Sequence, residues 1–230
     1  MRKQQKIWLE EHNRMGTLPT MANIDPASGV ILFTDWLQSN TIIKAKRAVD
    51  IGAGKGRNSV HLAKLGCKVW ALEYIEPALE SAKQLAKANE VNESIEFKLC
   101  EVDQTWEFEN DFFDFAIDSF SSIDIETLEG RKKCRDEMYR TLKPRGYALV
   151  TVCSADDEWE KELIEKYPGT EPNSTIWPQN GKFQKDYSED ELKEFYRKFK
   201  IVEFRTINKP AHKLGRDGTA TNFWMLIQKQ

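Results

Sequence analysis

The sequence of 230 residues predicts an α/β fold: a doubly wound, mostly parallel seven-stranded sheet whose last strand runs antiparallel. Three observations predict it. Short apolar runs alternate with helical patterns along the chain. The first of these runs ends in a glycine-rich turn, Gly52-Ala53-Gly54-Lys55-Gly56, that leads directly into a helical pattern. The last two runs are joined by a segment too short for a crossover helix, so they should pair antiparallel.

Strands and helices follow one another through the first two thirds of the chain. Apolar runs bounded by turn residues predict strands at about 46–51, Lys68–Glu73, Ile95–Leu99, Phe113–Asp118 and Tyr147–Val152. Apolar residues spaced by three or four predict helices at about 29–39, at about 57–65 before Gly66, along Ala78, Ala82, Leu85 and Ala86, and from Leu128 to Leu142 before Pro144. Ser28 is the expected N-cap of the first helix.

The last third begins with a long connection and ends with two strands. The sequence Ser188-Glu189-Asp190-Glu191 is a capping box, with Tyr187 and Leu192 as its hydrophobic staple. Two further strands are expected at Ile201–Ile207 and Asn222–Gln228, joined by a loop over Asn208–Ala220. The connection before the capping box is longer than ordinary loops, which is typical of a lid. We expect one domain, 1–230, with substrate-cap segments at about 1–28 and 154–186.

Composition excludes several functional classes. With 34 basic and 37 acidic side chains the net charge is −3, which disfavours a nucleic-acid partner. The four cysteines have no metal-binding spacing and suit free thiols in a reducing compartment, so we expect a cytoplasmic protein. The three histidines also lack ligand spacing, so no metal is expected. No apolar run approaches the length of a bilayer span, so no membrane partner is expected.

The glycine turn indicates a cofactor that carries adenosine. Glycines bring backbone N–H groups close to a ligand, at the positive end of the following helix. A dinucleotide fingerprint starting at Gly52 would need a third glycine at position 57, where the chain has Arg57, which disfavours NAD. Glu73 follows the turn by about twenty residues, the offset at which a carboxylate accepts hydrogen bonds from ribose hydroxyls. The alternative is an ordinary exposed glutamate at a strand end.

Four more residues near the strand ends are candidates for this site. Asp103 could accept the adenine amino group or cap a short turn. Asp50 could hold the glycine turn or a ligand ammonium. Tyr74 and Gln104 could form the walls of an adenine slot or could pack as ordinary strand-end residues.

Several motifs together resemble one known family, the class I S-adenosylmethionine-dependent methyltransferases. The motifs are Asp50 to Asn58, Glu73 with Pro77-Ala78-Leu79, Val102-Asp103, Phe113-Asp114, and Glu137 followed by Arg140-Thr141-Leu142-Lys143-Pro144-Arg145-Gly146. The similarity covers residues 46–153 motif by motif and 187–229 in outline. Arg145 departs from the glycine that is common at its position, which affects a turn before the fifth strand.

The resemblance implies a Rossmann-like methyltransferase fold, S-adenosylmethionine as cofactor and S-adenosylhomocysteine as product. It implies that Gly52 and Gly54, within the glycine turn that ends at Gly56, approach the methionine part. By the same resemblance Glu73 binds the ribose and Asp103 the adenine. Asp118 or Ser119 would face the methionine end.

The acceptor is expected at the rim formed by the cap segments. Methyl transfer is an in-line displacement, so alignment and exclusion of water can suffice. The side chains expected to contact a small-molecule acceptor, or simply to pin the cap, are Trp8, His12, Arg14, Trp177 and Phe183. A basic group, Lys209, His212, Lys213 and Arg216, could bind a carboxylate or phosphate or could be solvated. His212 and Tyr187 are the candidate bases.

Two other functions fit the same cofactor site. One is an RNA or protein methyltransferase, which would need a continuous basic surface. The other is a noncatalytic S-adenosylmethionine-binding partner subunit, which would show an apolar exposed face. The sequence is compatible with a monomer or a homodimer.

Overall fold

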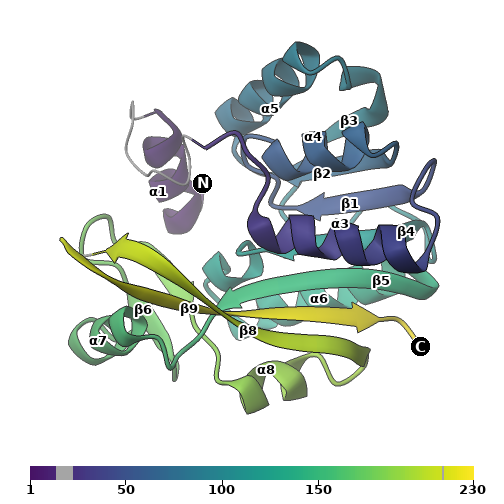
Figure 1. Ribbon diagram of the computed structural model, residues 1–230. Coiled ribbons are helices and arrows are strands. Elements are labelled where there is room, and N and C mark those ends of the chain that lie inside the picture. Colours follow the sequence, from purple (N-terminus) through teal and green to yellow (C-terminus); the bar gives the residue numbers. More distant parts are fainter. Residues whose placement is uncertain (14–22, 214) are drawn as a thin grey trace.

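A computed structural model describes residues 1–13, 23–213 and 215–230. Its main sheet has seven strands in the order β3-β2-β1-β4-β5-β9-β8 (Figure 1). Neighbouring strands from β3 to β5 are parallel, whereas β9 is antiparallel to both β5 and β8. The predicted fold class is therefore confirmed. The strands are β1 (Arg47–Ile51), β2 (Lys68–Glu73), β3 (Ile95–Leu99), β4 (Phe113–Ser119), β5 (Leu142–Cys153), β8 (Lys200–Lys213) and β9 (Arg216–Gln228).

Helices cover both faces of this sheet, as alternating strands and helices require. One face packs against α3 (Ser28–Asn40), α4 (Arg57–Lys64) and α5 (Glu76–Ala88). The other packs against α6 (Leu128–Thr141) and α8 (Glu189–Phe195). Each face has its own buried apolar cluster, and the central strands contribute alternate side chains to both. Of the short 3-10 helices in the described residues, η1 (Asn92–Ser94) precedes β3 and η2 (Ser122–Asp124) follows β4.

The remaining elements form a layer beyond the carboxyl ends of the parallel strands. They are α1 (Lys3–Asn13), α7 (Glu158–Lys166) and a small antiparallel sheet of β6 (Ser174–Ile176) and β7 (Phe183–Lys185). In Figure 1 the arrowhead of β1 points toward α1. The side-chain amide of Gln4 in α1 accepts a hydrogen bond from the Phe183 N–H (3.0 Å) and donates one to the Phe183 carbonyl (2.9 Å). The two predicted cap segments, 1–28 and 154–186, are thus in direct contact through Gln4 and Phe183.

Two helix boundaries differ from the prediction. Ser28 is the first residue of α3 and not its cap; the N-cap is Ala27, which makes no side-chain cap bond, and its N–H donates to the Asn58 side chain (2.9 Å). Helix α6 ends at Thr141, so Leu142 opens β5 instead of closing the helix. Pro144 lies inside the long strand that follows.

The prediction of a loop over Asn208–Ala220 is wrong. The structure extends both strands through it, and β8 and β9 pair as a twisted ribbon as far as Lys213 and Arg216. Pro210 lies within this ribbon although proline cannot donate a ladder hydrogen bond. At the edge of a sheet, however, a proline N can face solvent without loss.

The predicted connection at 154–186 is also more ordered than a loop, because it contains α7, β6 and β7. The capping box that follows it is half confirmed. The Ser188 hydroxyl accepts from the Glu191 N–H (3.2 Å). The Glu191 carboxylate pairs with Lys185 (2.7 Å) and with the Asn173 amide, so it joins the helix start to β7.

Candidate functional site

The glycine turn between β1 and α4 combines two close approaches with one open position. All three glycines have positive φ: +64° at Gly52, +56° at Gly54 and +82° at Gly56. A Cβ on Gly52 would lie 1.9 Å from the Ser121 Oγ, and one on Gly56 would lie 2.7 Å from the Ala82 Cβ. A Cβ on Gly54 would meet no described heavy atom within 4 Å. The middle glycine therefore leaves its backbone open to a ligand, which is what a nucleoside cofactor needs there.

Glu73 ties the end of β2 to this turn. One carboxylate oxygen accepts from the Gly54 N–H (2.9 Å), and the other accepts from the N–H groups of Tyr74 (2.8 Å) and Ile75 (2.9 Å). The side chain is 5% exposed, and burial raises its pKa although these three bonds oppose the rise. A carboxylate oxygen has two acceptor sites, so Oε2 keeps one beside the open face of Gly54.

Asp50 lies beneath the turn, at the end of β1. Its carboxylate accepts from the Ser59 hydroxyl (2.6 Å), which fixes the first turn of α4. Burial raises the pKa of Asp50 to about 6, although the Ser59 bond and the nearby Arg57 charge oppose the rise. Of the two roles predicted for Asp50, holding the turn therefore has a direct contact to support it.

Asp118 and Ser119 close β4 next to the turn. The Asp118 carboxylate accepts from the N–H groups of Ser121 (3.2 Å) and Ser122 (3.0 Å) and from the Tyr196 hydroxyl (3.4 Å). Ser119 accepts from the Thr151 hydroxyl (3.2 Å). The Asp118 bonds hold Ser121 in place, and the Ser121 side chain packs directly against Gly52. Asp118 therefore supports the glycine turn through Ser121.

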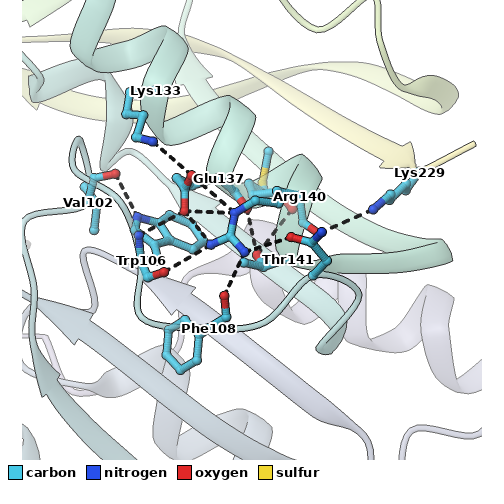
Figure 2. A network of polar contacts seen from close by, with 10 residues as sticks. Val102, Trp106, Phe108, Lys133, Glu137, Arg140, Thr141 and Lys229 are labelled. Carbon is cyan, nitrogen blue, oxygen red and sulfur yellow. Dashed lines mark hydrogen bonds and ion pairs between the residues drawn. The ribbon is translucent and has the colours of Figure 1, made fainter.

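Asp103 follows β3 in a loop that a polar network fastens to α6 (Figure 2). Glu137 accepts from the Trp106 N–H (2.9 Å) and pairs with Arg140 (2.6 Å). Arg140 donates in turn to the carbonyls of Trp106 (3.0 Å) and Phe108 (2.7 Å). Burial alone would raise the pKa of Glu137, but hydrogen bonds from Arg140, the Trp106 N–H and Lys133 lower it to about 2. The motif that contains Glu137 and Arg140 is therefore a clamp on the loop.

The N-terminal helix borders the same residues. Arg2 pairs with Asp103 and with Glu101 (2.5 Å). The Gln5 side chain donates to the Tyr74 carbonyl (3.3 Å). Of the two residues predicted to form the walls of the adenine slot, Tyr74 is half-buried and Gln104 is exposed. Sequence reasoning missed Arg2 and Gln5, because nothing in the N-terminal segment marks them as partners of residues about 70 to 100 positions away.

Two of the three predicted aromatic side chains, Trp8 and Trp177, lie around a lysine of the chain itself. The Lys182 ammonium lies 5.1 Å from the ring centroid of Trp8 and 5.4 Å from that of Trp177. It also pairs with Asp124 of η2 (3.1 Å) and bonds to the Gln184 side chain (3.4 Å). The Phe183 ring packs instead against the Arg131 guanidinium, 5.6 Å away. The sequence analysis did not single out Lys182, since its aromatic partners lie in separate segments.

His12 and Arg14 complete the group predicted on the N-terminal segment. Burial and the nearby Lys55 ammonium lower the pKa of His12 to about 4. Its ring lies 6.4 Å from that of Trp8, one helical turn away. Arg14 lies outside the described residues.

The predicted basic group is mostly paired with other parts of the chain. Lys213 pairs with the buried Glu160 of α7 (2.7 Å), Arg216 with Glu162 (2.6 Å), and Lys209 with the Ser28 hydroxyl. His212 lies on the exposed ribbon, where its ring bonds to Asp217 (2.8 Å). These contacts fasten the ribbon to α7 and α3.

The other candidate base, Tyr187, is buried. It is 2% exposed, and burial raises the pKa of its hydroxyl. The Lys185 ammonium lies 4.8 Å from its ring centroid. Tyr187 and His212 therefore lie in unlike surroundings, one inside the core and one on the exposed ribbon.

Comparison with known proteins identifies the family. A family model described as a methyltransferase domain matches residues 42–200. The chain belongs to this methyltransferase family. The match spans the strands that carry the glycine turn, Glu73 and Asp103, so the predicted resemblance to the class I S-adenosylmethionine-dependent methyltransferases is confirmed, and S-adenosylmethionine is the cofactor of that family. No curated protein matches the methyltransferase chain by sequence.

Solved structures share the fold of this methyltransferase at low identity. A Methanosarcina mazei S-adenosylmethionine-dependent methyltransferase is 23% identical, with a TM-score of 0.72 over 86% of this chain and 96% of that one. The Burkholderia thailandensis 1,6-didemethyltoxoflavin-N1-methyltransferase, solved with bound 1,6-didemethyltoxoflavin and S-adenosylhomocysteine, is 17% identical, with a TM-score of 0.71 over 99% of this chain and 88% of that one. A Thermotoga maritima protein described as a possible histamine N-methyltransferase is 18% identical, with a TM-score of 0.64 over 98% and 99%.

Two kinds of feature are absent from the described part of the methyltransferase chain. Within 1–13, 23–213 and 215–230, no helix combines the length and apolarity that a bilayer crossing requires. Over the same ranges, no three His, Cys, Asp or Glu side chains come together as a metal site would need.

Proposed function

We propose that this methyltransferase binds S-adenosylmethionine at the glycine turn and transfers its methyl group to a small-molecule acceptor by in-line displacement. The observation that carries the cofactor site is the open face of Gly54 beside the buried carboxylate of Glu73. When bound, the cofactor supplies a methyl group already activated by its positively charged sulfur. The chain's own residues then have to bind, orient and exclude water.

The assigned roles follow the order of the strand ends. Gly52, Gly54 and Gly56 shape the place for the methionine part, with Asp50 holding the turn beneath it. Glu73 at the end of β2 accepts a hydrogen bond from the ribose hydroxyls through the free position of Oε2. Asp103 takes the adenine amino group, flanked by Tyr74 and Gln104, while Asp118 and Ser119 close the methionine end.

The N-terminal segment and residues 154–186 are proposed to cap the acceptor. Hydrogen bonds between Gln4 and Phe183 and between Glu11 and Asn180 (3.1 Å) support one continuous cap. The Lys182 ammonium lies over the rings of both Trp8 and Trp177, which supports a role of these two rings in pinning the cap rather than in forming an acceptor box. The acceptor is then bounded by the remaining cap side chains around His12.

The charge distribution favours a small molecule over RNA or protein. Helix α7 and its flank carry acidic side chains from Asp156 to Glu165, and two of them pair with Lys213 and Arg216 of the ribbon. A polyanion at this edge would have to displace these pairs. For protein substrates and for a noncatalytic subunit no specific contact offers comparable support.

The experiment is methyl transfer from labelled S-adenosylmethionine to a fractionated metabolite extract. Wild type should label a small-molecule fraction. Glu73→Ala should not, whereas the exposed neighbour variant Glu76→Ala should behave like wild type. Label confined to RNA or protein would contradict the proposal. Calorimetry with S-adenosylhomocysteine and with NAD tests the site without an acceptor: heat with NAD alone would refute the cofactor assignment.

A further inference from the structure

Helix α1 follows the cofactor-site residues in the order of the cofactor's parts. At its start Arg2 pairs with Asp103, at the proposed adenine end. Further along, Gln5 donates to the Tyr74 carbonyl, beside the proposed ribose residue. In its last turn lies His12, whose pKa is lowered by burial and by the nearby charge of Lys55 in the glycine turn. Ten residues of helix rise about 15 Å, so the helix leads from the adenine end to the methionine end.

The two faces of α1 fix the direction of His12. Gln5 and His12 are seven residues apart, which is two helical turns, so both point to the same side. Gln4 and Glu11 are also seven apart, and they hold the neighbouring face to the 180–183 segment. The Gln5 hydrogen bond to the Tyr74 carbonyl turns this second face toward the end of β2, next to the glycine turn that Glu73 holds.

The His12 ring has a buried nitrogen atom, Nδ1, that makes no hydrogen bond to any described residue. An unsatisfied buried polar atom is destabilising, so a ligand that supplied the missing partner would bind more tightly for it. Burial and Lys55 keep the ring uncharged at neutral pH, because its pKa is about 4. A neutral imidazole can offer a lone pair, whereas an imidazolium cannot.

We propose that His12 Nδ1 faces the position of methyl transfer and takes the proton of an acceptor that carries an N–H or O–H group. This inference rests on the proposed function. The acceptor's N or O atom forms its bond to the methyl carbon, the bond between sulfur and that carbon breaks with its electron pair on sulfur, and the acceptor's proton passes to His12. The products are the methylated acceptor, the neutral thioether and an imidazolium that returns its proton to water. His12 is thereby a catalytic residue.

The test uses two ligands that need no acceptor. One is S-adenosylhomocysteine, and the other is sinefungin, in which a carbon bearing an amine replaces the methylated sulfur. The amine of sinefungin stands where the methyl group would be, so it should donate to His12 Nδ1. One charge-assisted hydrogen bond of about 1.4 kcal/mol makes sinefungin roughly tenfold tighter than S-adenosylhomocysteine in wild type.

Two variants separate this contact from folding. His12→Phe should bind S-adenosylhomocysteine as wild type does and lose the tenfold preference for sinefungin. His12→Gln, which keeps an acceptor atom, should retain part of it. A preference that is unchanged in His12→Phe would overturn the inference and leave the proposed function standing. If neither ligand bound to the wild type, the proposed function itself would fail.

Nitrogen NMR of the rings provides a readout independent of affinity. The chain has three histidines, so each ring can be assigned by substitution. Sinefungin should shift the Nδ1 resonance of His12, whereas His212 on the exposed ribbon serves as the internal reference. Equal shifts with sinefungin and with S-adenosylhomocysteine would contradict a contact to the amine.

Discussion

The glycine turn and the N-terminal helix are neighbours that are held in different ways. At the turn, carboxylates of Glu73 and Asp50 bond to backbone or hydroxyl groups fewer than twenty residues away in sequence. At the helix, Arg2 and Gln4 bond to partners about 100 and 179 residues away. The turn is held by contacts between residues near in sequence, while the helix is attached by side-chain contacts to distant parts of the chain. The proposed cofactor site would therefore have binding groups fixed by the turn itself and a cover that is attached separately.

The largest expected effect comes from removing the turn's central carboxylate. Glu73→Ala should weaken S-adenosylhomocysteine binding up to about 100-fold, because the one charge-assisted hydrogen bond that Oε2 can still accept from the ribose, worth about 1.5–3 kcal/mol, is lost. Calorimetry measures the affinity. The matched control is Glu76→Ala, three residues on and exposed, which should bind normally. Equal affinities of the two variants would remove Glu73 from the site.

The second effect tests the clamp that holds the loop of Asp103. Glu137→Ala should lower the free energy of unfolding by about 3 kcal/mol, since it leaves Arg140 and the Trp106 N–H without their buried partner. Thermal or urea unfolding measures the change. The exposed Glu129→Ala on the same helix should change it by less than about 0.5 kcal/mol.

The same clamp has a defined pH dependence. The pKa of Glu137 is about 2 in the folded chain against an ordinary 4.5, so the folded state holds this proton less tightly. Its stabilisation is complete above pH 4.5 and is lost as the pH falls through 2. The difference in stability between wild type and Glu137→Gln should therefore shrink as the pH is lowered from 5 to 3. A difference that stays constant would show that the charge of Glu137 is not what stabilises the clamp.

A smaller effect is expected in the cap. Lys182→Met keeps most of the side-chain volume but removes the cation beside Trp8, Trp177 and Asp124. The unfolding free energy should fall by about 2 kcal/mol, because the Asp124 carboxylate is left without its cation. The double variant Lys182→Met with Asp124→Asn should recover part of the loss. No recovery would mean that the rings and not the ion pair hold the cap.

The smallest effect concerns Arg2. Its side chain is 41% exposed, so its ion pairs with Asp103 and Glu101 are worth about 0.5–1 kcal/mol. Arg2→Ala should change the dissociation rate of S-adenosylhomocysteine two- to fivefold, and added salt should reduce the difference from wild type. Lys3→Ala, which removes an exposed neighbouring charge, is the control. A salt-independent difference would argue against an ionic attachment of the helix.

The contrast also explains which features the sequence could predict. The strand before Gly52, the turn and the helix after it are specified by adjacent residues, and Glu73 lies at a fixed offset, so these were predictable. The pairing of Arg2 with Asp103 and the position of Lys182 between two tryptophans depend on tertiary contacts that leave no periodic signal. The ribbon was missed for a related reason, because Pro210 opposes a strand everywhere except at an edge.

That edge has a consequence for association between copies of the chain. Strand β8 is the last strand of the sheet on its side, and an unprotected edge of 14 residues would template pairing with another chain. Pro210 removes one donor, a register shift between Ile201 and Glu203 interrupts the ladder, and Lys209 adds positive charge. These features discourage aggregation through sheet extension, so concentrated solutions should form no edge-to-edge fibrils while the ribbon stays folded.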